Sequence, residues 1–73
     1  MLQVSDKEVV RALERTGWIR MQSAGGSHVR LQRRDGTGRV VVPVHANKPL
    51  KVGTIASILK MAELTEAQLK ELL

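Results

Sequence analysis

The 73-residue sequence predicts an α+β fold with the element order α-β-β-β-α(-α), in which a three-stranded antiparallel sheet carries its helices on one face. Three observations predict it: a helix start signal near the N-terminus, three short alternating runs joined by glycine-rich turns, and a helical apolar pattern in the last third. A chain of this length forms one domain and buries only about 60% of its unfolded surface. We therefore expect a single domain over 1–73 with marginal stability.

The first helix has a complete start signal. Ser5 and Glu8 have the spacing of a capping box, and Val4 and Val9 occupy the positions of a hydrophobic staple around it. Gly17 is suited to the residue that follows a helix, because glycine adopts the left-handed conformation without strain. The sequence therefore predicts a helix that starts after Ser5 and ends just before Gly17.

Three runs of alternating polar and apolar residues predict strands over 18–23, 27–33 and 39–44, joined by turns at 24–26 and 35–38. The last third of the chain predicts two helices. The first is expected to begin near 52–54 without a good N-cap, and its apolar stripe has the spacing i, i+3, i+4, i+7. The stripe consists of Ile55, Ile58, Leu59 and Ala62. A second capping box, Thr65 and Gln68, predicts a short C-terminal helix within 65–73.

Pairing the strands through their turns gives an expected register. Ile19 is expected opposite Leu31 and therefore on the face toward the helices. Met21 is expected opposite Val29, and Val42 opposite Leu31, so that the apolar side chains share that face. The other face then collects polar and aromatic residues. These are Trp18, Arg20, Gln22, His28, Arg30 and Gln32, with His45 just beyond the third strand.

Charge indicates the kind of partner. Twelve Lys and Arg residues against seven Asp and Glu residues give a net charge of +5. The excess is concentrated in residues 18–60, where eight basic side chains accompany Asp35 as the one acidic side chain. Such a concentration predicts a polyanionic partner: nucleic acid, an acidic protein, or both. Trp18 is the only aromatic residue, so recognition of nucleic acid would use phosphates and shape more than base stacking.

Several classes of protein are disfavoured by composition. The chain contains no cysteine and only two histidines, which argues against a disulfide framework and against a metal site. No apolar run approaches the roughly 20 residues that span a bilayer. Residues 1–10 lack the basic-then-apolar order of a secretion signal. We therefore expect a cytoplasmic protein with no metal and no other cofactor.

The chain also contains an ordered set of short motifs. They are Gly17-Trp18, Gly26-Ser27-His28, Val42-Pro43, the basic connection from Lys48 to Lys51, and Gly53-Thr54-Ile55 followed by Ile58-Leu59-Lys60. In this order and spacing, residues 5–64 resemble the HicA family, small mRNA-cleaving toxins of toxin–antitoxin pairs. The resemblance implies a fold similar to the double-stranded-RNA-binding domain, metal-independent endoribonuclease activity on mRNA, and a HicB-like antitoxin as partner. It carries the family histidine onto His28 and leaves the role of 65–73 open.

His28 is the candidate general base. RNA supplies its own nucleophile, the 2′-OH, so a base needs only to take that proton for the oxygen to attack the adjacent phosphate. Histidine titrates close to neutral pH and suits this task. General base catalysis contributes about 10²–10⁴-fold, and the remainder must come from stabilisation of the negative charge. The alternative is an ordinary strand histidine that contacts solvent or a hydrogen-bond partner.

The candidate RNA contacts are Arg20, Gly26, Ser27, Arg30, Lys48 and Lys51. Arg20 is expected to face Arg30 across the first hairpin, where a phosphate between them would offset the repulsion of like charges. The two lysines, beside the start of the second helix, could hold phosphate through charge and backbone amides. For each residue the alternative is an ordinary turn or a solvated basic surface.

His45 is the candidate for a second acid or base. In the expected register it lies opposite His28, where it could protonate the leaving oxygen; the alternatives are a phosphate or antitoxin contact, or no role. Two other functions also fit the sequence. A non-catalytic RNA-binding module would use the same basic face without the histidine, and a protein-binding adaptor would not need RNA.

Overall fold

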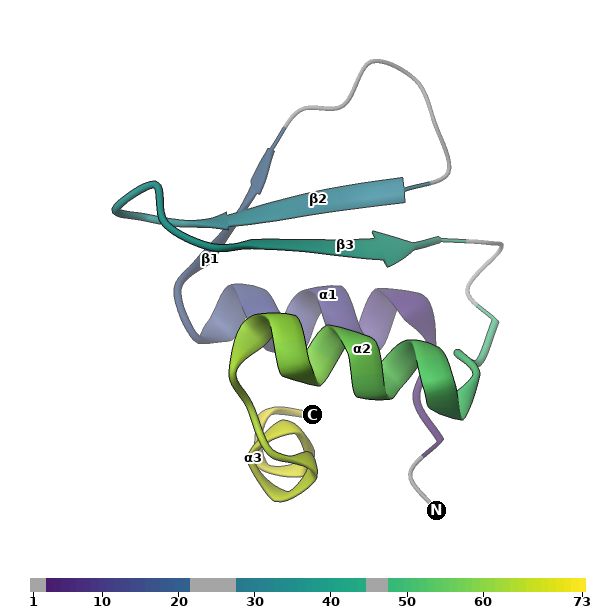
Figure 1. The fold of residues 1–73 in the computed structure, drawn as a ribbon. Helices are drawn as coiled ribbons and strands as arrows, with labels where there is room; N and C mark the ends of the chain where they lie inside the picture. Colours follow the sequence, from purple (N-terminus) through teal and green to yellow (C-terminus); the bar gives the residue numbers. More distant parts are fainter. Residues whose placement is uncertain (1–2, 22–27, 45–47) are drawn as a thin grey trace.

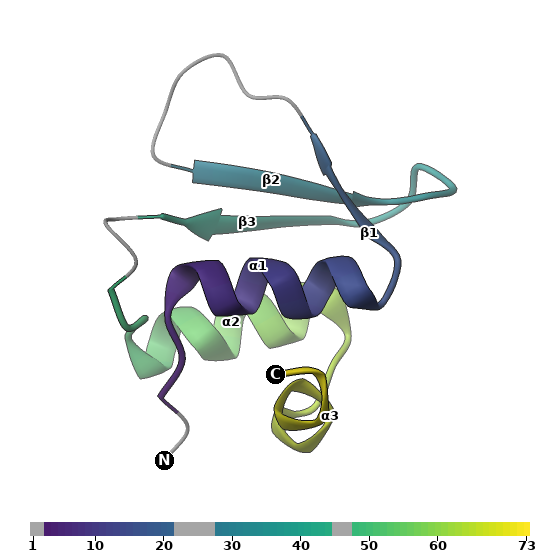
Figure 2. The same cartoon turned by 180° about the vertical axis from the view of Figure 1, so that it is seen from behind.

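The computed structural model describes residues 3–21, 28–44 and 48–73. Its elements are α1 (Asp6–Arg15), β1 (Trp18–Met21), β2 (His28–Arg33), β3 (Arg39–Pro43), α2 (Val52–Ala62) and α3 (Glu66–Leu72). Helices α1 and α2 lie side by side against one face of the sheet, and α3 lies beyond them on the side away from the sheet (Figures 1 and 2). The predicted α+β fold, with helices on one sheet face, is confirmed.

Both predicted capping boxes are present. The Ser5 hydroxyl accepts the Glu8 backbone N–H at 3.2 Å, and the Glu8 carboxylate accepts the Ser5 N–H at 3.2 Å. The same reciprocal pair joins Thr65 and Gln68 at the start of α3. At α2 the N-cap is Lys51, which makes no side-chain cap, as its sequence predicted. These local pairs satisfy backbone donors that the first turn of a helix cannot satisfy itself.

The register of β1 differs from the expected one by one residue. Arg20 pairs with Leu31 and Met21 with Arg30, so the expected Met21–Val29 and Ile19–Leu31 pairs are wrong. A slip of one residue exchanges the two faces of a strand. Ile19 and Met21 are therefore 43% and 44% exposed on the face without helices, whereas Trp18 is only 6% exposed. The physical reason is size, because burying an indole removes more apolar surface from water than burying Ile19 would.

The register of β2 and β3 differs from the expected one by two residues. Leu31 pairs with Val40 and Val29 with Val42, in place of the expected partners Val42 and Val44. An even shift keeps every side chain on its expected face, so the valines of β3 still point into the core. The turn between the two strands accommodates this shift. Gly36 and Gly38 in the turn have positive φ, the Arg33 N–H donates to the Thr37 carbonyl, and the Gly36 N–H donates to the Arg33 carbonyl.

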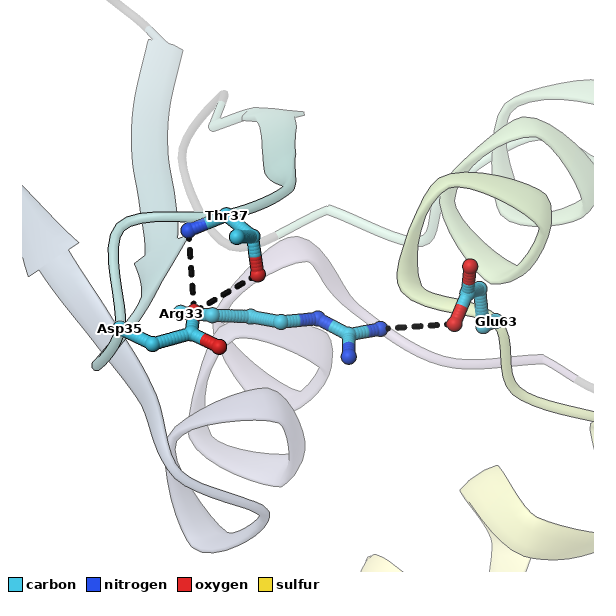
Figure 3. A network of polar contacts seen from close by, with 4 residues as sticks. All are labelled: Arg33, Asp35, Thr37 and Glu63. Atoms are coloured by element: carbon cyan, nitrogen blue, oxygen red, sulfur yellow. Dashed lines mark hydrogen bonds and ion pairs between the residues drawn. The ribbon is translucent and has the colours of Figure 1, made fainter.

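Arg33 joins this turn to the end of α2. Its guanidinium carbon lies 5.1 Å from the centre of the Trp18 ring, and its Nη2 is 3.0 Å from a Glu63 carboxylate oxygen. In the turn, the Asp35 carboxylate accepts two hydrogen bonds from Thr37, one from the backbone N–H at 2.9 Å and one from the side-chain hydroxyl at 2.6 Å (Figure 3). The ion pair is exposed to solvent and contributes little by charge alone. Its main effect is to hold the Arg33 side chain across the indole.

The core lies between the sheet and the helices and extends to α3. The buried apolar residues are Val4, Val9, Val10, Ala12, Leu13, Trp18, Leu31, Val40, Val42, Ile55, Ile58, Ala62 and Leu69. Leu69 comes from α3 and is 1% exposed, and the Arg15 guanidinium of α1 donates a hydrogen bond to the Leu72 carbonyl. The structural role of residues 65–73 is therefore to complete the core beneath α1.

We expect Leu69→Ala to lower the free energy of unfolding by about 2–5 kcal/mol, because it leaves a cavity under α1. The matched control is Leu73→Ala, which removes a leucine that is 45% exposed at the end of the same helix. Urea denaturation followed by circular dichroism measures both. Equal unfolding free energies for the two variants would show that α3 is not part of the cooperative unit.

We expect the pKa of the Asp35 carboxyl to lie below its ordinary value, because hydrogen bonds from the Thr37 hydroxyl and amide, with Arg33 nearby, favour the charged form. Its stabilising effect is present above the unfolded pKa and lost as the pH falls through the lower folded pKa. A carboxyl-carbon NMR titration should show the pKa rising in Thr37→Val and unchanged in the control Thr54→Val. An unchanged Asp35 pKa in Thr37→Val would contradict this account of the turn.

Candidate nucleic-acid interface

His28 is the first residue of β2 and is exposed. Val29 and Leu31 point toward the helices, so alternation places His28, with Arg30, on the opposite face, as the sequence predicted. We call this helix-free side the outer face. His28 lies at the end of the sheet beneath which both α1 and α2 begin (Figures 1 and 2). Its strand partner at that end is Pro43, the last residue of β3.

Pro43 occupies the position opposite His28 that the sequence assigned to His45. The expected His28–His45 pair is therefore wrong, because the β3 register is shifted by two residues. His45 itself lies outside the described residues, as do Gly26 and Ser27 on the other side of His28. Their suggested roles as second acid or base and as RNA contacts remain predictions.

The connection from Lys48 to Lys51 is held against the start of α1 by its backbone. The Asp6 N–H donates to the Lys48 carbonyl at 3.2 Å, and the Leu50 N–H donates to the Val4 carbonyl at 2.9 Å. Both lysine side chains remain exposed. The connection therefore carries two cations at the end of the molecule where α2 begins and where β2 carries His28 (Figure 1).

The beginning of α2 adds positive electrostatic character to that end. Its N-cap, Lys51, has no side-chain cap, and its first turn contains no acidic residue. By contrast, the first turn of α1 contains Asp6 and Glu8. Unsatisfied amide groups at a helix start favour an anion, and exposed lysines strengthen that preference. Of the two helix starts at this end, that of α2 is the one suited to a phosphate.

Arg20 does not lie where the sequence placed it. It pairs with Leu31 in the register, on the face toward the helices, and its guanidinium forms an ion pair with Glu14 of α1 at 3.4 Å. The expected Arg20–Arg30 pair is therefore wrong. The cause is the one-residue shift in the register of β1, which also turns Trp18 toward the helices. Arg30 remains on the outer face, directly between Met21 of β1 and Val41 of β3.

The outer face is hollowed around Arg30. The depression has a volume of about 480 Å³ and is lined by Met21, Arg30, Leu31, Gln32, Arg39 and Val41. The sequence does not predict Met21 in this depression, because the expected register places it on the face toward the helices. The signal that could have found it is Trp18, the largest apolar side chain of the β1 run and the one whose burial removes most surface from water.

A second depression, of about 520 Å³, lies at the other end of the sheet. It is lined by Thr16, Gly17, Trp18, Arg33, Arg34, Asp35, Ala62, Glu63 and Leu64. Trp18 forms part of its wall, but the ring is 6% exposed and covered by Arg33. Trp18 is therefore a packing residue and offers no stacking platform for a base, and its expected place on the polar face of the sheet is wrong, because the one-residue slip of β1 turns it toward the helices.

Within the described ranges 3–21, 28–44 and 48–73, no group of three or more His, Cys, Asp or Glu side chains is placed to hold a metal ion. The helices in these ranges are also too short or too polar to cross a membrane.

Residues 7–64 match the family described as the HicA toxin of bacterial toxin–antitoxin pairs. The chain belongs to the HicA toxin family. No curated protein was found to match it. The matched range includes His28, Arg30, Lys48 and Lys51, and it ends at Leu64, before α3 begins. The chain is therefore the toxin member of a toxin–antitoxin pair, and its C-terminal helix lies outside the matched range.

Proposed function

We propose that this HicA toxin is a metal-independent endoribonuclease that cleaves mRNA, with His28 as the general base. The observation that carries the proposal is the placement of His28, exposed on the outer face at the end of the sheet where α2 begins. Arg30, two positions further along β2, and the Lys48–Lys51 connection supply cations on and beside that end. This combination of an accessible imidazole and nearby positive charge suits an RNA phosphodiester.

The chemistry follows from the substrate. The His28 imidazole takes the proton of a ribose 2′-OH, and the 2′ oxygen attacks the neighbouring phosphorus. The bond from phosphorus to the 5′ oxygen breaks, which leaves a 2′,3′-cyclic phosphate on one fragment and, once the departing oxygen is protonated, a 5′-OH on the other. Because RNA provides the nucleophile, this sequence of steps does not require a metal-bound hydroxide.

The cations act on the charge that develops at the phosphate. Arg30 can donate two N–H groups to phosphate oxygens, and Lys48 and Lys51 add charge beside the open start of α2. Such groups stabilise the doubly charged phosphorane more than the ground state. Arg20 is left out of this set, because it is engaged by Glu14 on the helix side of the sheet.

Protonation of the leaving oxygen needs an acid or a water molecule. His45 remains the candidate acid on its sequence position alone, three residues before Lys48. Gly26 and Ser27, which directly precede His28, remain candidates for contacts from backbone amides and a hydroxyl. A bell-shaped pH–rate profile of cleavage that loses its alkaline limb in His45→Ala would support the acid role.

We expect His28→Asn to lower RNA cleavage by at least about 100-fold, because an amide can form hydrogen bonds but cannot take the 2′-OH proton. The measurement is single-turnover cleavage of a long labelled RNA in EDTA, with end analysis for cyclic phosphate and 5′-OH. Matched circular dichroism spectra and urea midpoints control for folding. Equal cleavage by the variant would remove the catalytic role, and RNA binding without cleavage by the wild type would favour a non-catalytic RNA-binding module.

We expect Arg30→Gln, made in the inactive His28→Asn background, to flatten the salt dependence of RNA binding by about 0.7 in the log–log slope, the contribution of one phosphate contact to a single strand. The control is Arg20→Gln, which removes an arginine already paired with Glu14 and should leave the slope unchanged. Binding titrations at several salt concentrations measure both. A slope that changes in the Arg20 variant and not in the Arg30 variant would reverse the assignment.

A further inference from the structure

The side chains of the outer face, over which no helix of the described chain lies, form rows that cross the three strands (Figures 1 and 2). The strand pairing gives two such rows, the first consisting of Met21, Arg30 and Val41 and the second of Ile19, Gln32 and Arg39. His28 lies one step before the first row on β2. Side chains on one face of an antiparallel strand repeat every two residues, or about 6.8 Å. The rows therefore repeat at an interval close to that between successive phosphates of an extended RNA strand.

Each row contains one arginine, Arg30 in the first and Arg39 in the second. Both side chains are exposed, and within the described ranges neither takes part in an ion pair. No Asp or Glu occupies β1, β2 or β3, so the described strands place no carboxylate beside the two arginines. An arginine binds a phosphate through two parallel N–H groups. Two arginines one row apart therefore match two successive phosphates of one strand.

The depression of about 480 Å³ is lined by both of these arginines. Met21 and Val41, which are 44% and 36% exposed, give it apolar walls. Gln32 gives it a side-chain amide, whose Nε2 donates a hydrogen bond to the Gly36 carbonyl at 3.0 Å. Within the described chain no group donates to Oε1 of the same amide, so the depression also has a hydrogen-bond acceptor. A nucleobase has matching chemistry, because its faces pack against apolar side chains and its edge carries hydrogen-bonding groups.

We propose that the substrate is single-stranded RNA that lies along β2, with its scissile phosphate at Arg30 and the next phosphate at Arg39, and that the base between these two phosphates binds in the depression. The inference rests on the proposed function in one respect, the placement of the scissile phosphate beside His28. Gln32 is then the residue that selects the base on one side of the cut.

The depression accepts a base only from a single strand. In a duplex the faces of each base are stacked and its pairing edge is occupied, so the base does not enter a depression of this kind. Trp18, the only aromatic residue, is buried, and Met21 and Val41 therefore contact the base in place of an aromatic ring. The Gln32 oxygen favours a base with an exocyclic amino group, which adenine, cytosine and guanine carry and uracil lacks.

The first test determines the base beside the cut. We expect the wild-type toxin to cleave sites with uracil in the depression about fivefold more slowly than sites with an amino-bearing base, the factor that one hydrogen bond contributes. Gln32→Leu should abolish this preference and leave the preferences at other positions unchanged. The measurement is single-turnover cleavage of a random-sequence single-stranded RNA library, with sequencing of the fragment ends. Equal cleavage with all four bases by the wild type, or an unchanged preference in Gln32→Leu, would overturn the proposal.

The second test does not depend on catalysis. Arg39→Gln and Arg11→Gln, each in the inactive His28→Asn background, form a matched pair, because Arg39 lies on the outer face and Arg11 is exposed on α1. We expect Arg39→Gln to lower the log–log salt slope of binding to a single-stranded oligonucleotide by about 0.7. Arg11→Gln should leave the slope unchanged. Binding titrations at several salt concentrations measure the slopes, and circular dichroism checks the fold of each variant.

The outcomes separate this inference from the proposed function. A slope that depends on Arg39, in a toxin that does not cleave RNA even with His28 intact, would uphold the placement of RNA along β2 and reject the proposed function. Cleavage of RNA with no effect of Gln32→Leu or Arg39→Gln would keep the proposed function and reject the subsite. A slope that changes in Arg11→Gln alone would place RNA on the helical side and overturn the proposal, as would tighter binding of a duplex than of a single strand of the same sequence.

Discussion

The burial of Trp18 beneath Arg33 determines which side chains the sheet presents to its surroundings. The two residues pair directly in the register, and the guanidinium lies 5.1 Å from the ring centre. Gly38 completes the arrangement, because a Cβ there would approach the Trp18 ring to 3.2 Å and Arg33 Nε to 3.3 Å. Once the indole faces the helices, strand alternation places Ile19 and Met21 on the outer face. The apolar character of that face is thus a consequence of one aromatic residue.

Local signals made the helices predictable. A capping box such as Ser5 with Glu8 joins residues three positions apart, so it can be recognised in the sequence without knowing the tertiary structure. The face of β2 was predictable for a similar reason, because Val29 and Leu31 alternate with polar residues and leave no competing choice for the core. His28 was accordingly placed on the correct face from sequence alone.

The register of β1 could not be predicted in the same way, because both of its alternating sets contain apolar residues. Trp18 belongs to one set and Ile19 with Met21 to the other, so the pattern does not decide which set is buried. The competition is decided by packing against the helices, which is a tertiary effect. The position of the Lys48–Lys51 connection could not be predicted either, because it also depends on a tertiary contact. The Lys48 carbonyl accepts a hydrogen bond from the backbone N–H of Asp6, 42 positions earlier in the chain.

The family match and the buried core have different boundaries. The match ends at Leu64, yet Leu69 of α3 is buried and Leu72 packs against the core. The helix also covers part of α1, the element whose start anchors the Lys48 connection. Loss of α3 packing would therefore loosen α1 first and, through α1, the cations beside His28. The added helix stabilises the site from a distance without contributing a group to it.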